Sequence, residues 1–534
     1  MATATQQKVL GAFYTSDPVA KFLVEWAIRS PNDTVLDPSC GDGVFLAAAS
    51  ERLLEFGNRA PSIWGVDVDP EALRASLLRS PGSRLVEGSF FSLRARDIPP
   101  VSTVVGNPPF IRYQTFNGEQ RSQALASALG AGVKLPQLCS SWAPFVVHAS
   151  TFLQNGGRLA MVLPSEFIHA QYAREVLRYL LRSFRRITVR MFRTKLFQAL
   201  SEDTLLLLCE DFGNRCQWCS ITPDSALEEA TQTDERAIPV DLEAVEAGKH
   251  RLTRYLLPPK VRHLYENLSG QDGVTRLGDA ADIGIGYVTG ANDYFHLTAP
   301  DAARWGIPSA YLKPAVLSLG DFHGTVFRKS DWEKRLQTGE KAYLLRIEQP
   351  TEKALRNGLW AYLAYGKKQG FQTRFKCQVR ENWFAVPHVR VGDAFLSYMS
   401  GGTPKLVRNS AGLVAPNTLH IVRFSRGFRW TSLLVGWQSS LTKLSCEIEG
   451  HALGGGLLKL EPTEAENVRI ALPNARDAKP LVEELDELLR RNKISEATNL
   501  VDTIVLRRRF ALSKSECDLL GDAARQLFDW RMHK

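Results

Sequence analysis

The sequence has no run of about 18 consecutive apolar residues, which is the length that a membrane-spanning helix needs, and its first residues lack the apolar segment of a secretion signal. Its 8 cysteines are scattered and suggest no disulfide framework. The one close pair, Cys216 and Cys219, has no second cysteine or histidine pair that would complete a zinc site. The sequence therefore predicts a cytoplasmic protein of a reducing compartment, with no membrane contact and no bound metal.

The composition is that of a globular protein with more than one core. With 534 residues the chain exceeds an ordinary single core, so we expect two or three domains. The residues are 44% hydrophobic and 23% charged, which is typical of globular chains. The formal net charge of +9 is compatible with a polyanionic partner but does not require one.

Segments with the periods of strands and helices alternate through the first 221 residues. Strands are expected to begin near residues 34, 63, 84, 104, 158, 187 and 204. Short turns and helices separate most of them. This alternation predicts a doubly wound α/β domain.

Two of the expected strands end in a carboxylate. The first ends at Asp37 and enters a turn in which Gly41 and Gly43 let the backbone bend sharply and approach a ligand. Because this turn is not GxGxxG and no Walker lysine follows, a nucleotide phosphate is not the favoured ligand, and Asp37 instead suits an ammonium or hydroxyl groups. The second strand ends near Asp67, where an acid of an α/β unit commonly binds ribose hydroxyls.

Another expected strand ends in a polar and rigid segment. Apolar residues lead directly into Asn107-Pro108-Pro109-Phe110. Prolines fix φ and have no N–H, so carbonyl groups in this segment can accept from a ligand. An amide oxygen, a proline-flanked carbonyl and an aromatic face suit a planar base that carries an exocyclic amino group. An isolated Asn-Pro-Pro is also compatible with a plain rigid turn.

Four stretches occur in an order that resembles a known enzyme family. They are Tyr14-Thr15-Ser16, Asp37-Pro38-Ser39-Cys40-Gly41-Asp42-Gly43-Val44-Phe45, Gly65-Val66-Asp67-Val68-Asp69-Pro70 and Asn107-Pro108-Pro109-Phe110. Together they resemble the motifs of the gamma-class (TaqI-like) DNA adenine-N6 methyltransferases. Softer matches in the second half extend the resemblance to about residue 470.

The resemblance, taken with composition and helical period, implies four segments. Residues 1–221 would form a Rossmann-like methyltransferase domain, dependent on S-adenosylmethionine, with a doubly wound, seven-stranded mixed sheet. Residues 222–250 would be an acidic connector. Residues 251–475 would form a mixed α+β DNA target-recognition domain, and residues 476–534 a helical C-terminal tail.

The resemblance also implies a cofactor site. The methyl donor would be S-adenosylmethionine, with Thr15 and the turn after Asp37 holding its methionine end and Asp67 its ribose. Where the family often has an acid that accepts from the cofactor's adenine amino group, this chain has Ser89, with Glu87 two residues earlier. The predicted cofactor-binding residues are Thr15, Asp37, Cys40, Gly41, Gly43, Asp67, Ser89, Phe90 and Asn107.

The predicted catalytic residues are Asn107, Pro108, Phe110 and Phe197. Adenine N6 is a poor nucleophile because its lone pair is conjugated into the ring. Two acceptors, the Asn107 oxygen and the Pro108 carbonyl, would favour the geometry and charge that develop during direct methyl transfer, with no metal and no cysteine nucleophile. The base must first be flipped out of the duplex, and Phe110 and, by similarity, Phe197 would stack against it.

Double-stranded DNA is the expected partner. Basic residues in both halves are candidates for contacts with phosphates or base edges. They are Arg185, Arg186, Arg190, Arg193, Lys195, Lys367, Lys368, Arg374, Lys376, Lys405 and Arg408. One chain with both catalysis and recognition does not require a dimer, so a monomer is sufficient. A fused nuclease is not expected, and any cognate restriction endonuclease would be encoded separately.

The sequence leaves other functions open. N4-cytosine methylation acts on a similar amino group, although those enzymes usually show Ser-Pro-Pro-Tyr. Protein-glutamine and RNA methyltransferases share the Asn-Pro-Pro-aromatic motif but need no long recognition half. Intact Asp37, Asp67 and Asn107 argue against a catalytically idle DNA-binding specificity protein, while Ser89 leaves that alternative some room.

Overall fold

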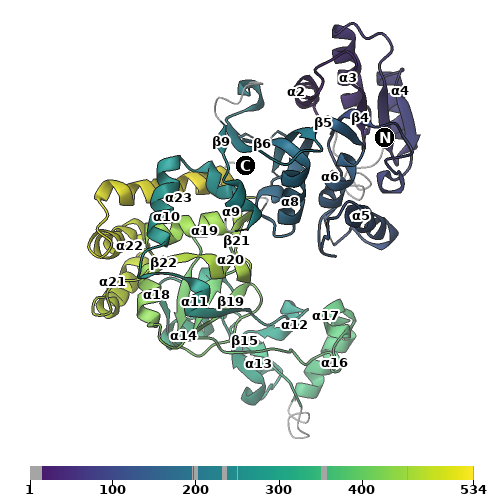
Figure 1. Ribbon diagram of the computed structural model, residues 1–534. Helices are drawn as coiled ribbons and strands as arrows, with labels where there is room; N and C mark the ends of the chain where they lie inside the picture. Colours follow the sequence, from purple (N-terminus) through teal and green to yellow (C-terminus); the bar gives the residue numbers. More distant parts are fainter. Residues whose placement is uncertain are drawn as a thin grey trace. The chain divides into compact units, whose positions relative to one another are not determined.

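The computed structural model describes residues 15–112, 114–194, 196–197, 203–230, 237–248, 250–349, 358–453 and 455–532. The chain divides into two compact units, of which the first ends at Pro258 and the second comprises Pro259–Met532 (Figure 1). None of the helices in the described ranges has both the length and the apolar character that a membrane crossing needs.

The first unit is built on one mixed β-sheet. Its strands are β1 (Val35–Asp37), β2 (Ile63–Asp67), β3 (Arg84–Glu87), β4 (Val101–Gly106), β5 (Leu153–Pro164), β6 (Phe184–Phe192), β7 (Thr204–Phe212), β8 (Trp218–Asp224) and β9 (Ile238–Pro239). Within the described residues they lie in the order β3-β2-β1-β4-β5-β7-β6-β8-β9. The strands that the sequence predicts are all present, and β8 and β9 extend the sheet beyond β6.

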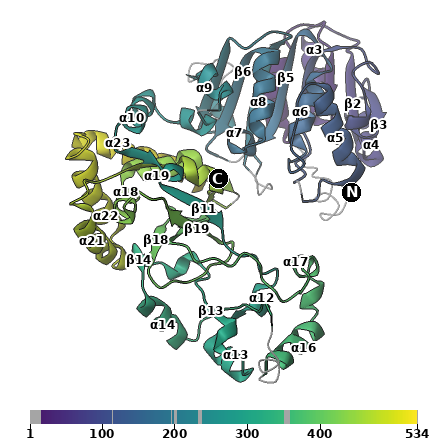
Figure 2. The ribbon, with the colours of Figure 1, turned by 60° about the horizontal axis from the view of Figure 1, so that its bottom comes forward.

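Helices cover both faces of this sheet (Figure 2). The main ones are α2 (Asp17–Ala27), α3 (Val44–Glu55), α4 (Pro70–Arg79), α5 (Gly118–Gly130), α6 (Trp142–Ser150), α7 (Glu166–His169) and α8 (Ala173–Ser183). α2 packs against α3, and α6 packs against α5 and α8. In α8, Val176, Leu177 and Leu180 are buried and lie on one side of the helix, which is the face that meets the core. The predicted doubly wound α/β fold is confirmed.

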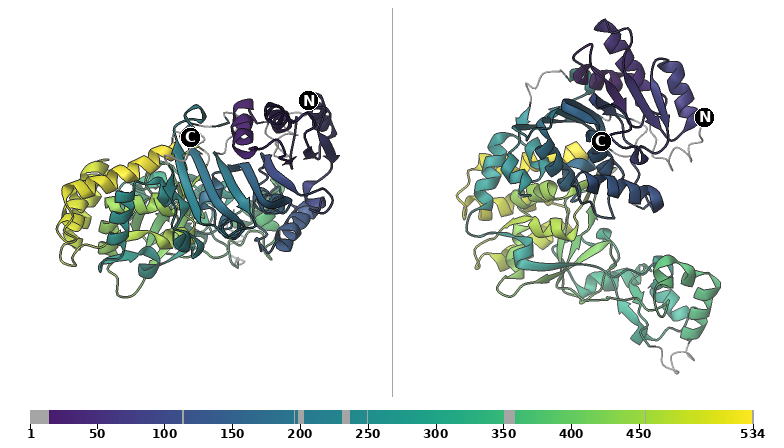
Figure 3. Two further views of the ribbon diagram at one scale, coloured as in Figure 1. Left: turned by 45° about the horizontal axis from the view of Figure 1, so that its top comes forward. Right: turned by 45° about the vertical axis from the view of Figure 1, so that its right-hand side comes forward.

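The strand directions bring several strand ends to one edge of the sheet. β1 is parallel to β2 and β4, and β4 is parallel to β5. β7 lies between β5 and β6 and is antiparallel to both, so β5 and β6 run the same way. β1, β2, β4, β5 and β6 therefore all end at the same edge (Figure 3). Ligands of open α/β sheets bind outside the carboxyl ends of the strands, so this edge carries the candidate site.

Residues 222–250, which the sequence suggests as an acidic connector, are part of the first unit. β8 continues to Asp224, and α9 (Leu242–Glu246) packs against α8 with Val245 buried. Arg190 Nε donates to Asp224 Oδ2 at 3.0 Å, and the two side chains are only 3% and 2% exposed. A pair between distant segments leaves no signal in local composition, which explains why this segment looks like a connector in the sequence.

The second unit is a mixed α+β structure. Its largest sheet has the order β11-β19-β16-β18-β14 within the described residues. The strands are β10 (Val274–Arg276), β11 (Ala281–Ile285), β12 (His296–Leu297), β13 (Leu312–Pro314), β14 (Val326–Phe327), β15 (Tyr343–Leu345), β16 (Ala394–Ser397), β17 (Met399–Ser400), β18 (Leu406–Asn409), β19 (Leu419–Phe424), β20 (His451–Leu453), β21 (Leu457–Lys459) and β22 (Arg469–Ala471).

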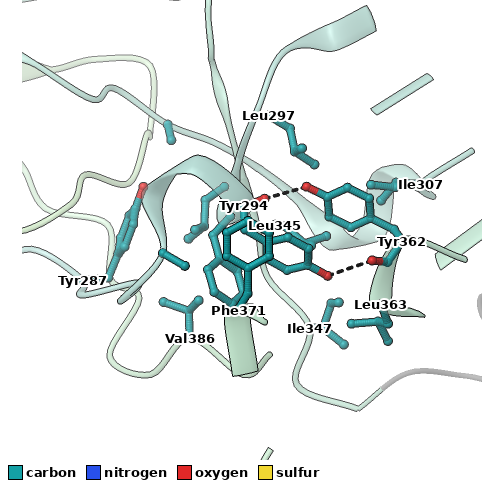
Figure 4. Packing of buried hydrophobic residues seen from close by; sticks show 14 of the residues in the cluster. Tyr287, Tyr294, Leu297, Ile307, Leu345, Ile347, Tyr362, Leu363, Phe371 and Val386 are labelled. Atoms are coloured by element: carbon teal, nitrogen blue, oxygen red, sulfur yellow. Dashed lines mark hydrogen bonds between the residues drawn. The ribbon is translucent and has the colours of Figure 1, made fainter. Parts of the chain in front are cut away.

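Helices surround these sheets (Figure 1). They are α10 (Pro259–Ser269), α11 (Leu277–Ala280), α12 (Asn292–Phe295), α13 (Ala299–Arg304), α14 (Lys329–Gln337), α16 (Trp360–Lys368), α17 (Phe375–Gln378), α18 (Trp430–Gly436), α19 (Ser440–Glu449), α20 (Pro462–Asn467), α21 (Ala478–Arg490), α22 (Ile494–Val501) and α23 (Lys514–Met532). Phe322, Phe327 and Phe395 form one core of this unit, and a second core surrounds Tyr294 and Tyr362 (Figure 4).

The C-terminal helices pack on the rest of the second unit. α21 lies against α18, and α23 lies against α19 and α10. Buried Asp486 also ties α21 to β14, since it accepts from the backbone N of Val326 at 3.0 Å and from Arg490 Nε of α21 itself at 2.8 Å. The apolar period that predicts a helical tail corresponds to the buried side chains of α21, among them Leu481 and Leu485.

The Arg190–Asp224 pair gives the first test. Asp224→Ala should lower the free energy of unfolding by about 3–5 kcal/mol, because removing one partner leaves the other charge buried. Urea denaturation of the full chain measures this loss. The double variant Asp224→Ala/Arg190→Met should lose less, since no unpaired charge remains in it. The single variant Arg190→Met completes the comparison. If the loss of stability in the double variant equals the sum of the losses in the two single variants, the buried-pair account is contradicted.

Candidate active site

The carboxylate of Asp37 lies at the end of β1 and is completely buried. Its Oδ1 accepts from the backbone N of Ser39 at 3.1 Å, while its Oδ2 is buried without a hydrogen-bond partner in the described structure. Gly106, the last residue of β4, lies directly beside it, since a Cβ built on Gly106 would stand 2.8 Å from Oδ1. Burial, with the nearby carboxylates of Asp67 and Asp42, raises the pKa of Asp37 to about 8.

Asp67 ties the end of β2 to the glycine-bearing turn. Its Oδ2 accepts from the backbone N of Gly41 at 2.9 Å, and its Oδ1 accepts from the backbone N of Asp69 at 2.9 Å. Burial raises the pKa of Asp67 as well. Gly41 and Gly43 have φ of 51° and 85°, and a Cβ on Gly43 would lie 2.4 Å from Ser76 Oγ. Both turn glycines are therefore required by backbone conformation, and Gly43 also by space.

Cys40 lies in the same turn, but its side chain is directed into the core. It is 3% exposed, and Ser76 Oγ of α4 donates to its Sγ at 3.9 Å. Burial raises the pKa of this thiol, so it remains protonated. Cys40 can offer the predicted cofactor site backbone groups, but not a reactive thiolate.

Asn107, which opens the fourth motif, contacts residues of the first and second motifs. Its Nδ2 donates to Thr15 Oγ1 at 3.2 Å, and Ser39 Oγ donates to its backbone carbonyl at 3.1 Å. Segments far apart in the sequence thus converge on one residue at the end of β4.

A serine that the motifs do not include holds the turn after Asn107. Ser141 Oγ donates to the carbonyl of Pro109 in a short hydrogen bond and accepts from the backbone N of Ile111 at 2.9 Å. The backbone N of Ser141 donates to the carbonyl of Ile111 at 3.0 Å. Between these contacts the Phe110 side chain is buried, at 7% exposure. The only sequence signal for Ser141 is a hydroxyl residue directly before a helix, which also describes an ordinary cap.

The third predicted strand contributes a polar turn and an aromatic cluster. Ser89 is half-buried after β3, and the backbone N of Gly88 donates to the carbonyl of Asp67 at 2.8 Å. The ring of Phe90 packs among those of Phe145, His148 and Phe152, with centroids 4.7–5.1 Å away. The Phe90 ring is thus part of the hydrophobic core, and Glu87 is exposed.

Phe197 lies in the connection between β6 and β7 and is 8% exposed. Because β6 ends at the same edge as β4, this connection starts on the side of the sheet that carries Asn107. Lys195, which the sequence suggests as a phosphate contact, lies outside the described residues, as do residues 198–202.

The structure separates the other basic residues before Phe197. Arg190 is buried with Asp224, so it serves the fold. Arg185 and Arg186 begin β6 at the opposite edge of the sheet, where they pair with Asp211 and Glu210 at 3.5 and 3.3 Å. Arg193 follows β6 at the edge of the site and is exposed.

Three cations of the second unit have internal partners. Lys405 Nζ donates to the carbonyl of Phe322 at 2.7 Å, and Arg408 Nη1 donates to the carbonyl of Asp393 at 2.8 Å. Arg374 forms an ion pair with Asp293 at 2.6 Å. Lys367, Lys368 and Lys376 are exposed.

Known family models match residues in both units. Residues 1–212 match the N-6 DNA Methylase family, and residues 249–506 match the Type II methyltransferase M.Eco57I, C-terminal domain. The first unit is thus similar to the N-6 DNA methylases, and the second to the C-terminal domain of a Type II methyltransferase. The chain is 21% identical over 469 residues to Type II methyltransferase M.AccI of Acinetobacter calcoaceticus, an alignment that covers 86% of the chain and 84% of M.AccI.

One solved structure shares its fold over nearly the whole chain. The Type IIL restriction-modification enzyme MmeI, solved in complex with DNA, matches over 98% of this chain and 80% of its own, with a TM-score of 0.62 and 13% identity. The type IIG restriction endonuclease BpuSI is 17% identical with a TM-score of 0.44, and the chain spans 66% of its length, just under two thirds. The MmeI match extends the fold similarity over both units.

The buried carboxylate of Asp37 gives a prediction for the free enzyme. A carboxyl with a raised pKa stays protonated in the folded state up to about pH 8, so its favourable contribution to stability is present near pH 4 and is lost as the pH rises to 8. Asn cannot ionise and keeps that contribution. The difference in free energy of unfolding between Asp37→Asn and the unchanged protein should therefore grow with pH, by up to about 1.4 kcal/mol per pH unit.

Urea denaturation at several pH values between 4 and 8, without cofactor, measures this difference. The two proteins should differ least at pH 4, and that pH serves as the internal control. A difference that is constant across the range would mean that the Asp37 carboxylate is not held in an environment that disfavours its charge.

Proposed function

We propose that this protein transfers a methyl group from S-adenosylmethionine to N6 of adenine at specific sites in double-stranded DNA, as the modification enzyme of a restriction-modification system. The observation that carries the proposal is the convergence on Asn107. An amide held by Thr15 stands at the end of β4, directly after Gly106, which lies against the buried carboxylate of Asp37. A cofactor and a base can therefore be held on either side of one short segment.

The residues present fit S-adenosylmethionine. Asp37 has a buried oxygen without a partner in the described structure, and an ammonium group would supply the missing counter-charge. The turn at Gly41 and Gly43 leaves backbone, rather than side chains, next to that carboxylate. Asp67 lies at the end of the neighbouring strand, where ribose hydroxyls are bound in such folds. The bound cofactor supplies a methyl group on a sulfonium that is already activated.

The chain's own contribution to the chemistry is a pair of oxygen acceptors. The Asn107 side-chain oxygen and the Pro108 carbonyl would accept from the two N–H bonds of the adenine amino group. This draws N6 towards the pyramidal geometry from which its lone pair can attack, and it stabilises the positive charge that develops there. The two prolines, and the Ser141 contacts with Pro109 and Ile111, restrict the segment that carries both acceptors before the base arrives, so little reorganisation would be needed during transfer.

A base in a duplex cannot reach the end of β4 without leaving the stack. Phe110 follows the acceptors in the same rigid segment and offers one aromatic face. Phe197 comes from the β6–β7 connection at the same edge and would offer the other. Arg193 is exposed beside this connection and is a candidate phosphate contact of the first unit.

The principal alternative is N4-cytosine methylation, which would use the same acceptors on a similar amino group. Asn107 favours adenine, because the cytosine enzymes usually carry serine at this position. A catalytically idle specificity protein is the second alternative, and the intact Asp37, Asp67 and Asn107 argue against it.

Asn107→Ala tests the acceptor role. It should reduce methyl transfer to duplex DNA by at least about 100-fold, because a preorganised acceptor is lost, while S-adenosylmethionine binding changes little. Digestion of the product DNA to nucleosides and mass spectrometry would measure N6-methyladenine and N4-methylcytosine separately. Asn32 is an exposed asparagine that precedes β1, at the opposite edge of the sheet. Asn32→Ala is therefore the matched control and should retain full activity. Substantial transfer by Asn107→Ala would exclude the acceptor role, and N4-methylcytosine as the product would select the alternative.

Phe197→Ala tests the stacking role. Its loss should weaken turnover of a normally paired adenine more than that of a mismatched adenine, because a mismatched base costs less to flip and depends less on stacking for its capture. The measurement is kcat/KM on two duplexes that differ only in the base opposite the target. Equal losses on both duplexes would assign Phe197 to the fold alone.

A further inference from the structure

One short region of the second unit is strongly basic and also exposes apolar side chains. Residues 358–380 contain five cations and no aspartate or glutamate. They include α16, α17 and the connection between them. The five cations are Lys367, Lys368, Arg374, Lys376 and Arg380. A region of this charge attracts a polyanion at long range.

Three residues anchor α17 and its flanks to α12 and to the loop before it. Arg374 donates to both carboxylate oxygens of Asp293, at 2.6 and 2.8 Å. Cys377 is completely buried, with its Sγ 3.8 Å from the carbonyl of Thr289. Arg380 donates to the carbonyls of Val288 and Thr289 at 2.7 and 2.8 Å. These three residues follow one another at intervals of three, so they share one side of the turn, and that side faces inward.

The opposite side of α17 faces outward. Phe375 is 71% exposed and Val379 is 67% exposed, and the two are four residues apart, so their side chains are neighbours. Lys376 lies between them, with its Nζ 5.5 Å from the centre of the Phe375 ring. We call these three residues the α17 face. The ring of a phenylalanine this exposed is in contact with water. Covering it with a partner would be favourable, because apolar surface would be removed from water.

A rigid aromatic core supports the α17 face. The Tyr294 and Tyr362 rings stack at 4.6 Å, and each hydroxyl donates to the other residue's carbonyl, at 3.1 and 2.7 Å (Figure 4). Phe371, three residues before Arg374, packs on Tyr294 at 4.9 Å. α16 joins this core closely, since a Cβ on Gly366 would lie 2.6 Å from the Trp383 ring. The exposed side chains are therefore held on a fixed support rather than on a loose loop.

We propose that the α17 face is a DNA-contacting surface of this methyltransferase, in which Phe375 and Val379 contact bases while Lys376, Lys367 and Lys368 neutralise phosphates. Charge complementarity commits the surface to DNA, because Lys376 lies against Phe375, Lys367 and Lys368 are exposed in the same region, and residues 358–380 contain no acidic residue. Lysines beside an exposed aromatic side chain are the combination with which proteins contact phosphates and the apolar surfaces of bases together. The proposal rests on the proposed function, since it names the surface that meets the same substrate.

Two variants separate the base contact from the phosphate contacts. Phe375→Ala should weaken binding to a duplex containing the methylated site by about 10-fold, and binding to a duplex without that site by much less, because base contacts carry the specificity. Lys376→Ala should weaken binding to both duplexes alike and reduce the salt slope of the binding constant by about one. Fluorescence anisotropy with the full chain at several salt concentrations measures both effects, on duplexes chosen after the methylated site is sequenced.

Matched controls come from exposed residues elsewhere in the second unit. Ile494→Ala on α22 and Lys479→Ala on α21 remove an exposed apolar and an exposed cationic side chain outside the region. Both controls should leave DNA binding unchanged, and all four variants should unfold at the same temperature as the unchanged protein.

The outcomes distinguish this inference from the proposed function. If the unchanged protein methylates adenine and binds its site, but Phe375→Ala and Lys376→Ala bind as tightly as their controls, the α17 face does not contact DNA and a protein partner is its occupant. If the unchanged protein neither methylates nor binds duplex DNA, the proposed function itself fails. A site-selective loss for Phe375→Ala with a uniform loss for Lys376→Ala supports the surface as proposed.

Discussion

The buried carboxylate of Asp37 is the constraint on which the candidate active site depends. A charged carboxylate with one oxygen unsatisfied is costly in a protein interior, and this burial raises the pKa of Asp37. The surroundings leave it room: Gly106 has no side chain, and the following turn is built on Gly41 and Gly43, both at positive φ. Asn107 follows Gly106 directly. The burial that makes a charge at the end of β1 unfavourable in isolation therefore creates a place for a cationic ligand next to the segment that would hold the base.

The fold of the first unit was largely accessible from the sequence, because its signals are local. Apolar strands, helical periods and glycine-bearing turns predict the α/β alternation, and the strand ends at Asp37, Asp67 and Asn107 predict one polar edge. The end of β8 and the whole of β9 were missed because they lie in a polar, acidic segment that hides the few residues extending the sheet. Arg190 and Asp224 show the same limit, since each looks like a surface charge until its distant partner is known.

Side-chain direction was the second limit. Phe90 and Cys40 lie in predicted motifs, but their side chains serve the aromatic core and the packing against α4. Ser141, in contrast, belongs to no predicted motif. Its hydroxyl and backbone nevertheless form the hydrogen bonds that fix the turn containing Phe110. In the second unit the sequence identifies cations but not their partners. The structure shows that Arg374 anchors α17 through Asp293, and that Lys376 stands exposed on the other side.

The central claim is that the Asn107 segment directs methyl transfer to adenine at a fixed DNA sequence. Long-read methylome sequencing of DNA from cells that express the protein tests it most directly, with cells expressing the Asn107→Ala variant as the comparison. The account predicts N6-methyladenine at one recurring sequence in the first sample and its absence in the second. No N6-methyladenine in the first sample, or the same pattern in both, would contradict it.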